Sequence, residues 1–181
     1  AETVTEGAVK SLQAHSASRS GAGEAEAVSL VRSLAPEHAR LHFCHLSSVA
    51  SIAAVRGQDT FEVAPHHLFL SYEDTGCSFT DTHKKMNPPL RSKSERLRLI
   101  QKFDMIPVIA SDHAPHTEEE KYAEFSNAPS GVPGVETMLP LLMKEVFEGR
   151  FTLASVIEKT VTNPNTILGI ESPGFIKGAR A

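Results

Sequence analysis

One carboxylate and two imidazoles follow an apolar run in the second half of the chain. Residues 106–110 are almost all apolar and branched, which predicts a strand buried on both faces, as in a parallel sheet. Asp112, His113 and His116 come next. Functional groups in α/β folds lie at the carboxyl ends of strands, so these side chains are candidates for metal binding or proton transfer. On this segment alone, a polar loop with a capping aspartate is an equally good interpretation.

His45 lies at the end of a second predicted strand, over residues 41–46. In a parallel sheet or barrel the strand ends converge on one face, so His45 and Asp112 are expected to meet there. An imidazole and a carboxylate make half of a hydrolytic zinc site, which needs further ligands and an open position for water. Taken alone, His45 is better explained as a core or helix-capping histidine, and His42 as a packing residue.

Glu62 is a carboxylate inside an otherwise apolar predicted strand, residues 60–64. Burying it unpaired would cost on the order of several kcal/mol. It therefore needs a metal, a cation or an internal cavity, unless its side chain faces outward.

Three further polar residues follow this strand. His66 and His67 are adjacent and cannot both point into one site, so we expect structural hydrogen bonds for the pair. Asn87 precedes two prolines, which fix the backbone and present the amide rigidly. An amide can donate to a carboxylate while it accepts from an N–H, as recognition of a ureide requires.

Amphipathic helices and loops alternate with these strands. Their spacing predicts helices over residues 3–13, 24–34, 48–56, 94–103, 134–148, 152–161 and 163–169, with Ser48 and Ser94 as caps, a loop over 16–23 and long polar loops over 71–89 and 118–133. This alternation favours parallel βαβ units. We expect three adjacent parallel strands in the order 41–45, 60–64, 106–110, too few to close a barrel alone.

The composition excludes several classes of function. The chain has 181 residues and a net charge of −4 without a basic block, which argues against nucleic acid and anionic membrane as partners. It holds no apolar run of transmembrane length and no signal-peptide pattern. Two cysteines, Cys44 and Cys77, make no disulfide framework, so we expect a cytoplasmic location. The chain opens on Ala1 without an initiator methionine and closes as an extended segment begins, so we expect a piece of a longer protein.

Four blocks in the sequence resemble the dihydroorotase family of the amidohydrolase superfamily, in the family's order. They are FEVAPHHLFL at residues 61–70, KMNPPLR at 85–91, ASDHAPHT at 110–117 and GVPGVETMLP at 131–140. In addition, HFCHLS at residues 42–47 resembles the sixth-strand metal motif of that family, and the opening Ala1-Glu2 resembles the end of its His-Ala-Glu motif. Together the blocks are far more specific than any one of them.

The resemblance implies a fold and an activity. The fold is a TIM-like (β/α)8 metal-dependent hydrolase barrel with a binuclear zinc centre, here with only the later strands and helices. Residues 1–175 would be the C-terminal portion of that barrel, and residues 176–181 the start of a flanking small β segment. The activity is the reversible cyclisation of N-carbamoyl-L-aspartate to L-dihydroorotate in pyrimidine biosynthesis.

The resemblance also implies roles for the metal-site residues. His45 would be the sixth-strand zinc ligand. Asp112 would ligate zinc and act as general acid and base on the metal-bound water. In some relatives a seventh-strand glutamate, here Glu62, contacts an additional metal.

For the substrate, the resemblance implies that Asn87 and His116 hold it and that the backbone near Ser130 and Gly131 contacts the pyrimidine ring. The first-strand His-x-His and its arginine, the bridging fourth-strand lysine (aspartate in some relatives) and the fifth-strand histidine lie outside this chain. We therefore expect that the rest of the barrel is required for two metals and for turnover. A homo-oligomer or a partner from the pyrimidine pathway is also compatible with the resemblance.

Two alternatives stay open. A hydantoinase or allantoinase would act on another cyclic ureide, and the PHHL and KMNPP segments together with His116 favour dihydroorotase over both. A non-catalytic, dihydroorotase-like scaffold domain is the other alternative, and the presence of His45, Asp112, Asn87 and His116 argues against it.

Overall fold

The computed structural model describes residues 9–74, 81–171 and 177. The α-helices are α1 (Leu12–Ser18), α2 (Gly21–Leu34), α3 (Val49–Ala54), α4 (Pro65–Phe69), α5 (Lys93–Ile100), α6 (Glu118–Lys121), α7 (Val135–Phe147), α8 (Leu153–Ile157) and α9 (Asn163–Leu168). Short 3-10 helices are η2 (Asp81–Lys84) and η3 (Phe103–Met105), and a π-helical stretch, η4 (Glu158–Thr162), joins α8 to α9. The strands are β1 (His42–Phe43), β2 (Thr60–Val63) and β3 (Val108–Ile109).

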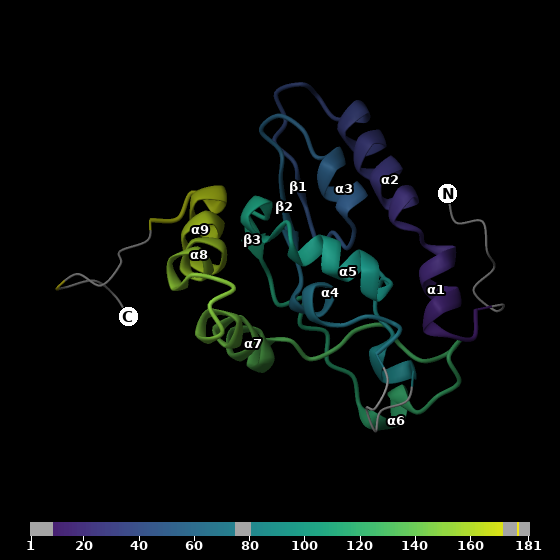
Figure 1. Cartoon of the computed structure of the whole chain (residues 1–181). Helices are drawn as coiled ribbons and strands as arrows, with labels where there is room; N and C mark the ends of the chain where they lie inside the picture. Colours follow the sequence, from purple (N-terminus) through teal and green to yellow (C-terminus); the bar gives the residue numbers. More distant parts are fainter. Residues whose placement is uncertain (1–8, 75–80, 172–176, 178–181) are drawn as a thin grey trace.

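The three strands form one parallel sheet in the order β1-β2-β3 (Figure 1). His42 pairs with Thr60, and Glu62 pairs with Val108. The predicted order and direction are confirmed, although β1 and β3 are shorter than expected. Because all three strands run the same way, their carboxyl ends open on one edge of the sheet.

One face of the sheet is packed against helices. Side chains alternate along a strand, so Phe61 and Val63 enter the core while Thr60 and Glu62 face the other way. Each covering helix adds an apolar residue to this core: Val28 from α2, Ile52 from α3, Leu68 from α4, Leu99 from α5, Leu142 from α7 and Val156 from α8. The opposite face therefore carries the polar side chains of β1 and β2.

Several helices begin at other residues than predicted, because different serines cap them. The loop expected over residues 16–23 is wrong, because Ser11 caps α1 and Ser20 caps α2, each accepting from a backbone N–H three residues on. Ser92 caps α5, not Ser94, and its hydroxyl accepts from the backbone N–H of Glu95. Most of the helix expected over residues 3–13 lies outside the described residues.

The connection over residues 118–133 is more ordered than a long polar loop. It begins with α6. Thr117 and Glu120 cap the N-terminus of this helix, because the side chain of each accepts a hydrogen bond from the backbone N–H of the other. Lys121, Phe125 and Ala128 in the connection are buried. The segment is thus attached to the body of the protein. Within the described residues, no helix is long and apolar enough to cross a membrane.

Candidate metal and substrate site

His45 and Asp112 follow β1 and β3 at the same edge of the parallel sheet. Both have left-handed backbones, with φ of 42° and 45°, and among the described residues they are the two non-glycine positions with positive φ. Such a conformation costs on the order of 1–3 kcal/mol, and residues that keep it cluster at functional sites. Strain at two strand ends of one sheet marks this edge as a candidate site.

His66 lies near these two residues. It comes from α4, is 6% exposed, and its Nε2 is 3.5 Å from Oδ2 of Asp112. Burial, together with the nearby His67 and His45, lowers the pKa of His66 to about 3, although the carboxylate of Asp112 opposes the shift. Both His45 and Asp112 therefore lie close enough to a neutral His66 to influence its pKa.

The two adjacent histidines have different roles, which corrects the expectation for one of them. His67 makes the predicted structural contact, since its Nε2 lies 3.0 Å from the carbonyl oxygen of Pro88. His66 instead faces Asp112, and its buried Nε2 makes no hydrogen bond within the described residues. Neighbouring residues on a helix point about 100° apart, so α4 can direct one ring to the site and the other to the loop.

A second polar group, His42, Cys44 and Glu62, lies on the face of the sheet away from the helices. Nε2 of His42 is 3.1 Å from Oε2 of Glu62, and its Nδ1 is 2.8 Å from Oγ1 of Thr60. Burial and Glu62 raise the pKa of the Cys44 thiol. One ligand atom from each of the three residues lies within 4.8 Å of the others, a spacing that a metal ion can bridge.

This arrangement changes the interpretation of His42 and supports that of Glu62. His42 is exposed and polar-bonded, not a packing residue, because its strand neighbour Phe43 takes the core-facing position. Glu62 meets the imidazole of His42, a polar partner of the kind that a carboxylate within a strand requires.

The residues expected to hold a substrate lie on two segments that touch. The first segment covers residues 82–87, and the second covers residues 116–131. Nε2 of His116 is 3.1 Å from the carbonyl oxygen of Ser130, and the N–H of Gly131 donates to the carbonyl of Lys85 at 2.9 Å. Gly131 has φ of 137°, and a Cβ there would lie 2.7 Å from Ala114. Only glycine allows this approach, so the segment runs directly against the end of β3.

Asn87 stands two residues beyond Lys85 and is exposed. Its side chain hydrogen-bonds His15, a buried histidine of α1 whose Nε2 lies 3.1 Å from the carbonyl oxygen of Met86. Burial lowers the pKa of His15. Sequence reasoning missed His15 and the site-facing position of His66, because nothing in either segment shows which distant group the ring meets.

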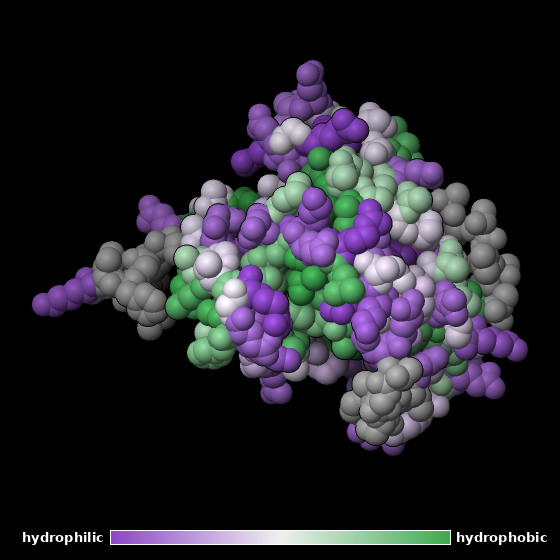
Figure 2. All heavy atoms as spheres, in the orientation of Figure 1, coloured by the Kyte–Doolittle hydropathy of each residue, from purple (hydrophilic) through white to green (hydrophobic). Residues whose placement is uncertain are grey.

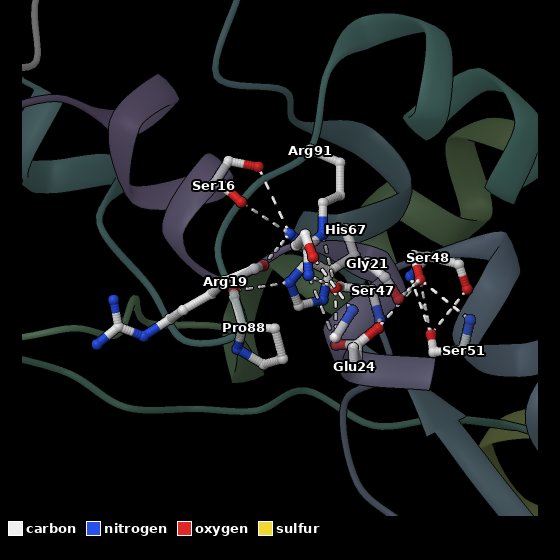
Figure 3. Close-up of polar contacts among 12 residues, drawn as sticks. Ser16, Arg19, Gly21, Glu24, Ser47, Ser48, Ser51, His67, Pro88 and Arg91 are labelled. Atoms are coloured by element: carbon white, nitrogen blue, oxygen red, sulfur yellow. Dashed lines mark hydrogen bonds and ion pairs between the residues drawn. The ribbon is translucent and has the colours of Figure 1, made fainter. Parts of the chain in front are cut away.

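A buried polar network fixes the backbone that follows His45 (Figure 3). The guanidinium of Arg91 donates to Oγ of Ser47 at 3.0 and 2.8 Å. Glu24 on α2 accepts from the N–H and hydroxyl of Ser47 at 3.1 and 2.8 Å, and from the hydroxyl of Ser48 at 3.2 Å. Charge-assisted hydrogen bonds of this kind hold the turn that presents His45.

Comparison with known proteins gives both family likeness and fold. No family model matches the chain. The chain is 42% identical to the dihydroorotase of Halobacterium salinarum over 171 residues, which is 92% of this chain and 40% of that protein. It is 43% identical to the dihydroorotase of Pyrococcus furiosus over 144 residues, 77% of this chain and 33% of that protein. The predicted likeness to dihydroorotases is confirmed. The chain spans about two fifths of the length of these relatives, as the 40% coverage shows.

Solved structures confirm the fold. The chain superposes on the D-hydantoinase of Bacillus sp. AR9 with a TM-score of 0.75 and 22% identity, over 88% of this chain and 38% of that one. The dihydropyrimidinase of Brevibacillus agri NCHU1002 gives 0.76 and 23%, over 91% and 39%. The dihydroorotase of Saccharomyces cerevisiae, solved with 5-fluoroorotic acid, gives 0.67 and 17%, over 82% and 43%. The sheet and its helices are therefore part of the predicted (β/α)8 barrel.

Proposed function

We propose that the protein to which this chain belongs is a dihydroorotase, a cyclic amide hydrolase that interconverts N-carbamoyl-L-aspartate and L-dihydroorotate. The observation that carries the proposal is the meeting of His45, His66 and Asp112 at one edge of the parallel sheet, with strained backbones at both strand ends. The likeness to curated dihydroorotases over 92% of the chain supports it.

His45 and Asp112 fit a zinc site in their chemistry. Nδ1 of His45 is buried and makes no hydrogen bond within the described residues, which suits a metal ligand or its outer partner. Imidazole and carboxylate are both zinc ligands. A binuclear zinc centre would supply hydroxide near neutral pH and polarise the amide carbonyl. Glu62, with His42 and Cys44, would hold an additional ion.

Asp112 would carry the proton in both directions. In ring opening, the carboxylate would take a proton from the attacking water and pass it to the departing ring nitrogen. In ring closure, it would take a proton from the ureido nitrogen and return it to the oxygen that leaves as water. The nearby His66, with its pKa lowered to about 3, is neutral and adds no competing charge.

Substrate recognition would fall to the two touching segments. The substrate is anionic while the chain has a net charge of −4, so its recognition must be local. Asn87 would bind the ureide, His116 the carboxylate, and the backbone near Ser130 and Gly131 the ring. These residues are held within one contact network by Lys85 and Ser130.

The rest of the barrel would supply the other metal ligands and cover an apolar surface. Figure 2 shows apolar side chains gathered where α7 and α8 lie in Figure 1. Three apolar side chains of α7 are exposed: Phe147 is 84% exposed, Val135 58% and Leu139 54%. Surfaces of this kind mark interfaces. A homo-oligomer, a pyrimidine-pathway partner, a cytoplasmic location and the division into residues 1–175 and 176–181 are parts of the same proposal.

The test is a turnover assay on the full-length protein that carries this chain. Carbamoyl-aspartate and dihydroorotate, a hydantoin and allantoin are compared as substrates. Turnover of the first pair, lost by a factor of about 10² to 10⁴ in Asp112→Asn, supports the proposal. Turnover of the hydantoin or allantoin alone would replace it by another cyclic amidohydrolase, and no turnover of any would favour a scaffold domain.

A further inference from the structure

Lys121 is a buried charge with an unusual set of partners. It ends α6, is 5% exposed, and donates to three backbone carbonyl oxygens: Thr82 at 3.2 Å, Lys85 at 3.1 Å and Pro129 at 2.9 Å. An ammonium group has three N–H donors and no acceptor, so these three carbonyls match its full donor capacity.

The three carbonyls lie on the two segments that carry the proposed substrate residues. Thr82 and Lys85 precede Asn87, and Pro129 precedes Ser130. The carbonyl of Lys85 also accepts from the N–H of Gly131 at 2.9 Å. A single ammonium group therefore lies at the junction of both segments.

A second lysine bonds to carbonyl oxygens at the same junction. Nζ of Lys85 donates to the carbonyls of Phe125 and Ala128 at 2.7 Å each and lies 5.1 Å from the ring centre of Phe125. Each segment thus sends one lysine into the carbonyls of the other. The two contacts are reciprocal, and Lys121 is the more buried of the two residues.

We propose that Lys121 is a positioning residue that fixes the separation between Asn87 on one segment and Ser130 and Gly131 on the other, and so sets the width of the substrate subsite. This inference rests on the proposed function of those residues. Lys121 acts through the backbone and has no role in proton transfer. Its place outside the main apolar core, whose members come from the sheet and its covering helices, fits a local task.

The experiment compares Lys121→Met and Lys121→Arg in the full-length protein, with Lys93→Met as the control. Lys93 is an exposed residue in the first turn of α5. Methionine has a side chain of similar length to lysine but no hydrogen-bond donors, while arginine keeps the positive charge and several N–H donors. We expect Lys121→Met to raise the KM for dihydroorotate about tenfold or more, with a smaller change in kcat. The KM of Lys121→Arg should lie between those of the wild type and Lys121→Met. Lys93→Met should change neither KM nor kcat.

Hydrogen exchange supplies a readout that does not depend on turnover. The amide of Gly131 donates to the carbonyl of Lys85, which also accepts from Lys121. The amide of Ala110 donates to the carbonyl of Val63 in the sheet. Lys121→Met should speed exchange at Gly131 more than at Ala110. An equal change at both amides, or an unchanged KM in an active protein, would overturn the proposal. If the wild type has no dihydroorotase activity, the proposed function fails, while the exchange rates still decide whether Lys121 joins the segments.

Discussion

Two buried cations hold the two sides of the candidate site, and they are satisfied in different ways. Arg91 is 7% exposed, lies 3.8 Å from Glu24 and shares Ser47 with it. Lys121 is 5% exposed and donates to three neutral carbonyls. The first cation fixes the turn after His45, and the second joins the segments around Asn87 and Gly131.

The difference lies in how each charge tolerates burial. Burial lowers the pKa of Arg91, and Glu24 raises it again. Burial and, to a smaller extent, the nearby charge of Lys85 lower the pKa of Lys121 to about 8. An arginine stays charged at any physiological pH, whereas a lysine with a pKa of about 8 loses its charge progressively as the pH rises through 8. The turn after His45 should therefore keep its geometry as pH changes, while the geometry around Asn87 and Gly131 should depend on pH.

The largest effect is expected for Arg91→Met. The substitution removes the cationic partner of Glu24, whose side chain is only 14% exposed. Leaving a buried charge without its partner costs about 3–5 kcal/mol of the free energy of unfolding. Urea denaturation of the full-length protein measures the change in the free energy of unfolding. Arg98→Met is the control, because Arg98 is 66% exposed and pairs with Glu95 on its own helix. Equal changes in the two variants would show that the Arg91 network is not a structural centre.

Lys121→Met should destabilise the protein less. It removes the donors of three buried or partly buried carbonyls that are neutral, and the loss of such a partner costs about 1–3 kcal/mol. The same denaturation experiment gives the comparison with Arg91→Met. A larger loss for Lys121→Met than for Arg91→Met would reverse the ranking of the two cations.

The smallest effect is a pH dependence. The folded pKa of Lys121, about 8, lies below its ordinary value of 10.5, so between these values the unfolded chain binds more protons than the folded one. Stability contributed by this group therefore rises with pH across that window, by at most about 1.4 kcal/mol per unit. The free energy of unfolding is measured for the wild type and for Lys121→Met at each pH. The difference between the two isolates the contribution of Lys121 from that of the other lysines. Meanwhile the neutral amine has two donors for three carbonyls, so KM should rise above pH 8. A stability difference that falls with pH would contradict the assignment.

The sequence predicted the parts of the site that follow from strands. Short apolar runs ending in His45 and Asp112 indicate buried parallel strands, and parallel strands bring their ends together whatever separates them in the chain. The sequence also indicated that Glu62 needs a partner, because a carboxylate among apolar strand residues cannot be buried alone.

The parts that failed depend on contacts between distant segments. The direction of His66 depends on how α4 meets β3, and a pair of adjacent histidines gives no sign of which ring faces the site. Lys121 lies in a stretch of charged residues that predicts solvent exposure, yet α6 turns it toward the carbonyls of Thr82 and Lys85. The starts of α1 and α2 were missed because several serines compete as caps.

The most direct test of the central account is the zinc content of the full-length protein, measured after metal-free purification and reloading. If His45 and Asp112 are ligands of one binuclear centre, His45→Ala should lower the zinc-to-protein ratio by about one and abolish turnover of dihydroorotate. The control His38→Ala, an exposed histidine after α2, should keep both. Unchanged zinc content and turnover in His45→Ala would contradict the assignment of this edge of the sheet as the metal site.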